Sequence, residues 1–118
     1  MYVMKPILEP DVIDLLNNGR FEGDLQGYVL SDGGDLFGWS LFCVRGDVTE
    51  MLDVKAPDTK FLDGIIRASV ALGESQGAEY FSLNEKVADF AKYKEVFFED
   101  QGEKIPCNLL FSGCKHEE

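Results

Sequence analysis

The stretch VTEMLDVKAPDTKFLDGIIRASVALGESQGAEYF, residues Val48 to Phe81, decides the fold. Its first part alternates with a period of two, which predicts a strand with one set of residues on a common face. The residues on that face are Val48, Glu50, Leu52 and Val54. Pro57 cannot donate a ladder hydrogen bond, so the strand is expected to end before it.

After Pro57 the apolar spacing changes to three and four, which indicates an amphipathic helix. Asp58 or Thr59 offers a side-chain oxygen to the free N–H groups at the helix start. Gly77 suits the left-handed conformation that ends many helices, and the strand Ala78–Leu83 follows it. Two strands joined by such a helix are predicted to be parallel, with a right-handed crossover. The apolar positions of the helix are Leu62, Ile65, Ile66, Val70 and Leu72.

The composition indicates one folded domain with an acidic surface. The chain has 118 residues, of which 45% are hydrophobic and 12% aromatic, and this is enough to bury a core. Its net charge of −11 argues against nucleic acid and against an anionic membrane surface as partners, because both attract Lys and Arg. No run approaches the roughly 20 apolar residues of a membrane span, and no signal peptide is evident.

The cysteines predict reduced thiols and a cytoplasmic location. Cys43, Cys107 and Cys114 are an odd number and cannot all pair within the chain. Cys107, Cys114 and His116 lack the spacing and the fourth ligand of a zinc site, so no metal is expected. The DGGD run at 32–35 offers too few ligands for calcium and is interpreted as a turn.

Short turns predict an antiparallel meander that leads into the Val48 strand. The strands Leu25–Leu30 and Leu36–Val44 are separated by paired glycines, and Arg45-Gly46-Asp47 makes the second turn. We interpret that triplet as a hairpin turn and not as an adhesion motif. An edge strand within Met1–Leu8 and a short helix from Pro10 are expected before the meander.

Beyond Leu83 the sequence predicts a short helix and a closing hairpin. The helix is expected at Glu85–Tyr93, with Phe90 on its inner side. Aromatic residues at Val96–Phe98 predict a strand that Gln101-Gly102 turns back into a last strand, Ile105–Phe111. The fold class is therefore α+β: a mixed sheet with an antiparallel meander, a central parallel βαβ unit and a C-terminal hairpin.

This order of elements resembles the GNAT family of N-acetyltransferases, from about Gly27 to Phe111. The strand Thr49–Val54 before Pro57 and the helix that starts at Leu62 carry the resemblance. The segment Phe90–Phe98 is similar to the short helix and aromatic strand near the family's C-terminus. The resemblance implies transfer of an acetyl group from acetyl-coenzyme A to an amine of a small molecule or a protein. The acidic surface would favour a cationic amine.

The resemblance also implies where acetyl-coenzyme A binds. The parallel strands of the family separate, here beyond Val54 and Phe81, and the pantetheine arm lies in that opening. The diphosphate meets N–H groups at the start of the following helix, a segment that here contains Thr59, Lys60, Phe61 and Leu62. Family members usually carry a glycine-rich turn there. The loop Ala56–Leu62 has no glycine and places Asp58 where a phosphate would lie.

Two residues are candidates for acid–base chemistry. Glu50 matches the glutamate that several family members use to deprotonate the amine; alternatively, a different register places it at an edge or in solvent. Tyr93 matches the family's tyrosine that returns a proton to the leaving thiolate, although an alignment shifted by one residue puts Lys92 there. A tyrosine that only packs its ring is the other interpretation of Tyr93. The competing hypothesis for the whole chain is a non-catalytic scaffold that binds a small molecule or a protein.

Overall fold

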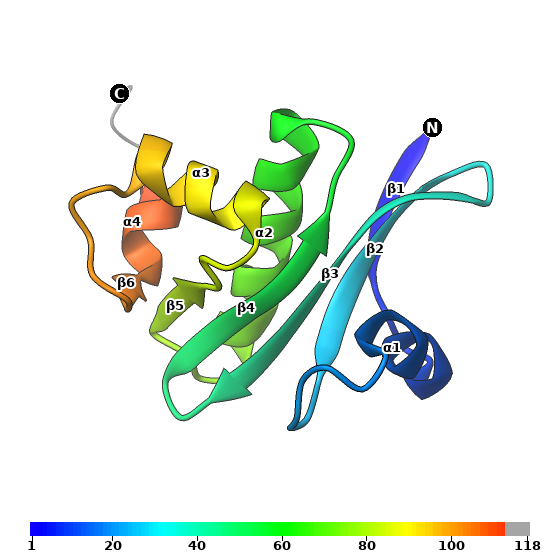
Figure 1. Cartoon of the computed structure of the whole chain (residues 1–118), viewed down its shortest axis with the longest axis horizontal. Coiled ribbons are helices and arrows are strands. Elements are labelled where there is room, and N and C mark those ends of the chain that lie inside the picture. The colour runs from blue at the N-terminus through cyan, green and yellow to red at the C-terminus, as the bar shows by residue number, and fades with distance from the viewer. Residues whose placement is uncertain (113–118) are drawn as a thin grey trace.

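The computed structural model describes residues 1–112, which form one six-stranded sheet and four helices (Figure 1). The elements in chain order are β1 (Tyr2–Pro6), α1 (Pro10–Asn17), β2 (Gln26–Asp32), β3 (Asp35–Arg45), β4 (Val48–Lys55), α2 (Thr59–Ser75), β5 (Tyr80–Leu83), α3 (Ala88–Phe97), β6 (Ile105–Pro106) and α4 (Cys107–Ser112).

The strands lie side by side in the order of the sequence, from β1 to β6. All neighbouring pairs are antiparallel except β4 and β5, which are parallel and connected through α2. The predicted meander is β2–β3–β4, and the Arg45-Gly46-Asp47 triplet forms its second turn. The first turn contains Gly33 and Gly34, both with positive φ, as the paired glycines indicated. The predicted α+β class with a parallel βαβ unit is confirmed.

The main core lies between one face of the sheet and α2. Asp58 caps the helix: its side chain accepts a hydrogen bond from the N–H of Phe61 at 2.9 Å. At the other end Gly77 has a φ of +105° and terminates the helix as predicted. The buried face of α2 packs on strands of the meander and on Phe81 of β5. Its apolar members are Leu62, Ile65, Ile66 and Val70.

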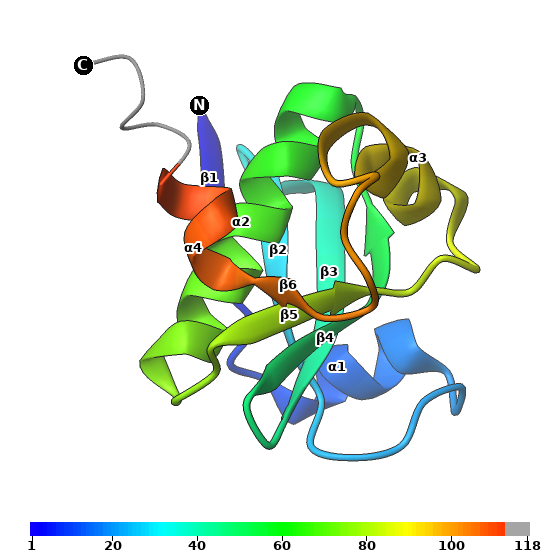
Figure 2. The same ribbon diagram turned by 90° about the vertical axis from the view of Figure 1, so that its left-hand side faces the viewer.

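The other face of the sheet carries α1 against β3 and is less covered (Figures 1 and 2). Leu41 and Cys43 of β3 are buried on this face. Arg20, which follows α1, forms an ion pair of 2.7 Å with Asp53 of β4 and so attaches α1 to the centre of the sheet.

A bulge in β4 changes which residues face the core. The register between β3 and β4 shifts between Leu41 and Phe42, so Leu52 is an extra residue on β4. Thr49, Met51 and Val54 are therefore the buried positions of β4. The expectation that Glu50 and Val54 share a face was wrong, because the strict period of two does not hold across a bulge.

The predicted C-terminal hairpin is also not formed. The helix α3 continues through Val96 and Phe97, where a strand was expected, because Phe90 and Tyr93 of the same helix anchor it in the core. The last strand, β6, has only two residues and pairs antiparallel with β5. The chain then turns into α4, since Cys107 and Leu110, three residues apart, are buried as one helix face.

Candidate functional site

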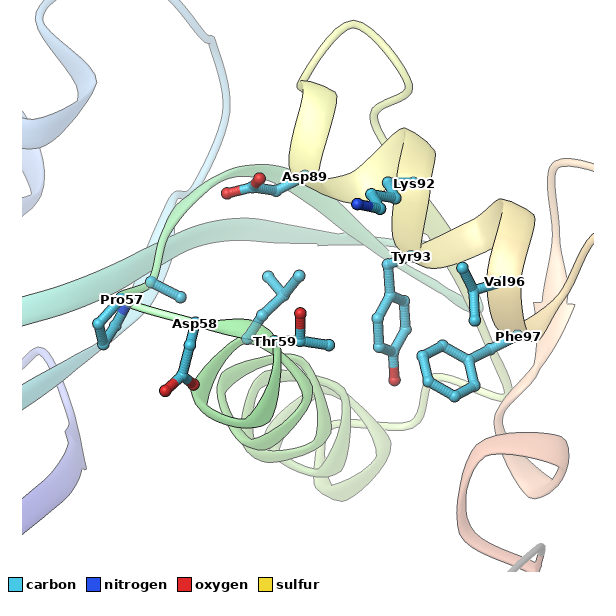
Figure 3. A pocket seen from close by; sticks show the side chains of 10 residues that line it. Pro57, Asp58, Thr59, Asp89, Lys92, Tyr93, Val96 and Phe97 are labelled. Atoms are coloured by element: carbon cyan, nitrogen blue, oxygen red, sulfur yellow. The ribbon is translucent and has the colours of Figure 1, made fainter.

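A pocket of about 290 Å³ lies between the start of α2 and α3 (Figure 3). The loop after β4 and the first turn of α2 form one wall, and the exposed side of α3 forms the other. Three residues that the sequence predicted for catalysis or cofactor binding line it: Thr59, Leu62 and Tyr93. Asp58 and Lys92, the alternative to Tyr93, line it as well. The full lining is Ala56, Pro57, Asp58, Thr59, Leu62, Asp89, Lys92, Tyr93, Val96 and Phe97.

The other residues proposed for cofactor binding lie outside this pocket. Val54 is buried beneath α2 in the core. Phe61 points to the far side of the helix, where its ring centre lies 4.7 Å from that of Tyr2. The side chain of Lys60 is exposed at the helix start and is not among the lining residues. The pocket therefore contains the start of α2 but only part of the segment that the resemblance indicated.

The parallel strands do not separate beyond Phe81, where the resemblance placed the opening, because the ladder with β4 runs to the end of β5. The last pair of the ladder is Met51 with Leu83, so β4 continues beyond the end of β5. The backbone left free on β4 is satisfied by the chain itself. The Asn84 side chain donates to the carbonyl of Leu52 at 2.9 Å, and the N–H of Val54 donates to the carboxylate of Asp53 at 2.8 Å.

Sequence reasoning did not find Asp53 or Asn84, and the sequence carries a signal for only one of them. Asn84 follows a strand and precedes a helix, which is a common place for a side chain that bonds to backbone groups. Asp53 reaches its position because the bulge turns it to the same face as Glu50, and this depends on the pairing of β4 with β3.

Glu50 lies on the face of the sheet that is turned away from α2. Its side chain is 35% exposed and forms an ion pair of 3.0 Å with Arg45. A surface groove borders it, on the open face beside the last pair between β4 and β5. The polar lining residues of this groove are Glu50, Ser82, Asn84, Glu85, Lys86 and Glu103. The structure thus separates Glu50 from the pocket that contains Tyr93.

Tyr93 is buried, and its hydroxyl is bound within the protein. It donates to the carboxylate of Asp63 on α2 at 2.5 Å. The other oxygen of Asp63 accepts from Arg67, which also donates to the carbonyl of Leu110. Burial, and then the bond to Asp63, raises the pKa of Tyr93 well above the usual range. The network joins α2, α3 and α4. Asp63 and Arg67 have the i,i+4 spacing of a helical ion pair, which the sequence shows. The hydrogen bond from Tyr93 to Asp63 has no such signal in the sequence.

The raised pKa of Tyr93 predicts a specific loss of stability at alkaline pH. The folded state holds this proton more tightly than the unfolded chain, so the contribution is complete below about pH 10 and is lost as the pH rises further. Urea unfolding from pH 7 to 11 should show Tyr93→Phe about 1–2 kcal/mol less stable at pH 7. The difference should shrink above about pH 10. If the free energies of unfolding of the native chain and of Tyr93→Phe fall in parallel above that pH, this account is contradicted.

Three solved structures with a similar architecture are acetyltransferases. An acetyltransferase from Bacillus subtilis in complex with CoA superimposes with a TM-score of 0.56 at 12% identity, over 80% of this chain and 74% of that one. The ribosomal-protein-S18-alanine N-acetyltransferase of Escherichia coli gives 0.57 at 14% identity, over 81% and 76%. IAA acetyltransferase from Bacillus cereus gives 0.58 at 18% identity, over 81% and 75%. The chain has a GNAT-like fold.

Among the comparisons with known proteins, only those of structure identify the GNAT-like fold. No protein-family model and no curated protein matches the sequence. At identities of 12–18% the likeness concerns the fold and leaves the chemistry to be argued from the residues. Within this fold, the pocket contains part of the helix start where the resemblance implied the cofactor.

Residues 1–112 contain no helix that is long and apolar enough to cross a membrane. The same residues contain no group of three or more metal-ligating side chains. Cys43 and Cys107 are buried free thiols. Cys114 and His116, which the sequence analysis considered with Cys107 as zinc ligands, lie outside the described part.

Proposed function

We propose that this chain transfers an acetyl group from a pantetheine thioester to an amine, with acetyl-coenzyme A as the donor that the fold implies. The observation that carries the proposal is the pocket at the start of α2, the helix whose start the resemblance implied for the cofactor. The groove that contains Glu50 lies on the open face of the sheet, beside the last pair between β4 and β5. Donor and acceptor would approach each other from the two sides.

The reaction needs one base on this chain. The amine nitrogen attacks the thioester carbonyl carbon, an amide forms, and the C–S bond breaks. Glu50 takes the proton of the amine. Return of a proton by Tyr93 stays a prediction, and the bond to Asp63 does not favour it. The leaving thiolate does not require that proton from the protein, because a thiolate is a good leaving group and can take a proton from water after the C–S bond has broken.

A second function is favoured by a different observation. The chain's own side chains bind backbone groups near the expected cofactor position: Asp58 at the helix start, and Asp53 and Asn84 on the backbone of β4. This arrangement supports a non-catalytic scaffold that uses the pocket or its surface to bind a small molecule or a protein.

Thermal unfolding with and without millimolar acetyl-coenzyme A tests the proposal. A ligand at ten times its Kd stabilises the folded state by about 1.4 kcal/mol, and at a hundred times by about 2.7 kcal/mol. For a domain of this size these values correspond to Tm increases of roughly five and ten degrees. Lys60→Ala should keep the increase if backbone N–H groups hold the donor, and should abolish it if the lysine ammonium does. If neither acetyl-coenzyme A nor acetyl-pantetheine changes the Tm, the scaffold function remains.

A further inference from the structure

The start of α2 already carries an anion of its own. The carboxylate of Asp58 accepts the N–H of Phe61 at 2.9 Å, and the carbonyl of Asp58 accepts the N–H of Leu62 at 2.9 Å. A carboxylate at this position offsets the positive end of the helix dipole, which is the feature that attracts phosphate to helix starts. A diphosphate that entered here would meet a negative charge and would compete with it for the same donors.

The backbone at this helix start is also poorly accessible to phosphate oxygens. Residues 56–62 contain no glycine, so every backbone unit carries a side chain, and Pro57 has no N–H to donate. The N–H groups of Thr59 and Lys60 are the ones that helix geometry leaves without an intrahelical acceptor. Of these two residues only Thr59 lines the pocket, and one N–H donor can bind an amide or thioester carbonyl but cannot replace the water that hydrates a diphosphate.

The rest of the pocket is apolar with a negative balance of charge. Its lining contains the carboxylates of Asp58 and Asp89 and one ammonium, that of Lys92 (Figure 3). The remaining wall is mostly alkyl and aromatic, and Val96 and Phe97 are 62% and 54% exposed there. Exposed apolar side chains beside a pocket suit an uncharged ligand of alkyl and amide groups.

Building on the proposed function, we propose that the pocket accepts the uncharged pantetheine arm of a thioester and disfavours its diphosphate, and that Asp58 determines this selectivity. The preferred donor is then a pantetheine thioester without phosphate groups beside the helix start. The wall of α3 holds the alkyl part of the arm, the Thr59 N–H group meets one of its carbonyl oxygens, and the Asp58 carboxylate repels phosphate.

The test compares two donors on matched variants. S-acetyl-pantetheine and acetyl-coenzyme A carry the same thioester and differ by the phosphates and adenosine. Asp58→Asn keeps the capping oxygen but removes the charge, since Asn is as good a cap as Asp. Glu74→Gln is the matched control, because it removes one carboxylate from the opposite end of the same helix. Each Kd is measured by calorimetry at low and at moderate salt.

Asp58→Asn should tighten acetyl-coenzyme A binding by roughly three- to tenfold and leave acetyl-pantetheine within about twofold. Glu74→Gln should change neither donor by more than about twofold. Added salt should help acetyl-coenzyme A bind to the native chain more than to Asp58→Asn, because it screens the repulsion. Equal effects of Asp58→Asn on both donors, or native binding that is tenfold tighter for acetyl-coenzyme A, would overturn the selectivity but leave the proposed function. Failure of both donors to bind any variant would overturn the proposed function itself.

Discussion

Gly73→Ala should destabilise the fold by at least about 3 kcal/mol. Gly73 is buried in α2 directly over Thr49 of β4, and a Cβ at this position would lie 1.8 Å from the Thr49 hydroxyl oxygen. It would also lie 3.0 Å from the Thr49 Cβ, so the helix and the strand would have to move apart. For a domain with a total stability of about 5–15 kcal/mol this is a large share. Chemical unfolding, monitored by circular dichroism, measures the loss.

The contact can be separated from the general effect of a helical substitution. Gly64→Ala on the same helix is the control, because a Cβ there meets only the end of the Met4 side chain, at 3.4 Å. It should be neutral or stabilise the protein by up to about 1 kcal/mol, since alanine favours the helix. Thr49→Ala should restore part of the loss in Gly73→Ala by removing the clashing hydroxyl and methyl groups. Equal stabilities of Gly73→Ala and Gly64→Ala would contradict the close approach of α2 to β4 at Gly73.

Glu50→Gln should lower kcat for acetyl transfer by about a hundredfold or more, the usual contribution of a general base. The side chain keeps its size but cannot take the proton of the amine. Its ion pair with Arg45 is partly exposed, so its loss should cost less than about 1 kcal/mol of stability. Steady-state rates over a range of pH, with the Tm of each variant, measure both effects.

The pH profile distinguishes a base from a binding residue. Without the carboxylate, the rate should rise with pH as more of the amine loses its proton in solution, and the difference from the native chain should become smaller. Glu99→Gln, an exposed carboxylate on the loop after α3, serves as the charge control. A Glu50→Gln variant with native kcat would assign the proton transfer to another group.

The sequence predicted the βαβ unit well because local patterns determine it. Leu62, Ile65, Ile66 and Val70 recur at helical spacing, and all four are buried under the sheet. Asp58 caps the helix with an interaction between residues three positions apart, which sequence alone can indicate. In these elements the local preference and the tertiary environment agree.

The errors arose where contacts distant in the sequence overrode local preference. Val96 and Phe97 favour a strand, but they lie on α3 because Phe90 and Tyr93 hold that helix in the core. The candidate site was affected in the same way. The bond from Tyr93 to Asp63 joins residues 30 positions apart, and no pattern in either segment indicates it.

The bulge at Leu52 has a consequence for comparing this chain with others. On a regular strand, residues an odd number of positions apart point in opposite directions, yet Glu50 and Asp53 lie on the same face of β4. The first half of the strand buries Thr49 and Met51, and the second half buries Val54. An alignment that runs without a gap between this strand and an unbulged one will match inward with outward positions in one of the two halves. A one-residue gap at Leu52 is needed before any substitution pattern along β4 can be read.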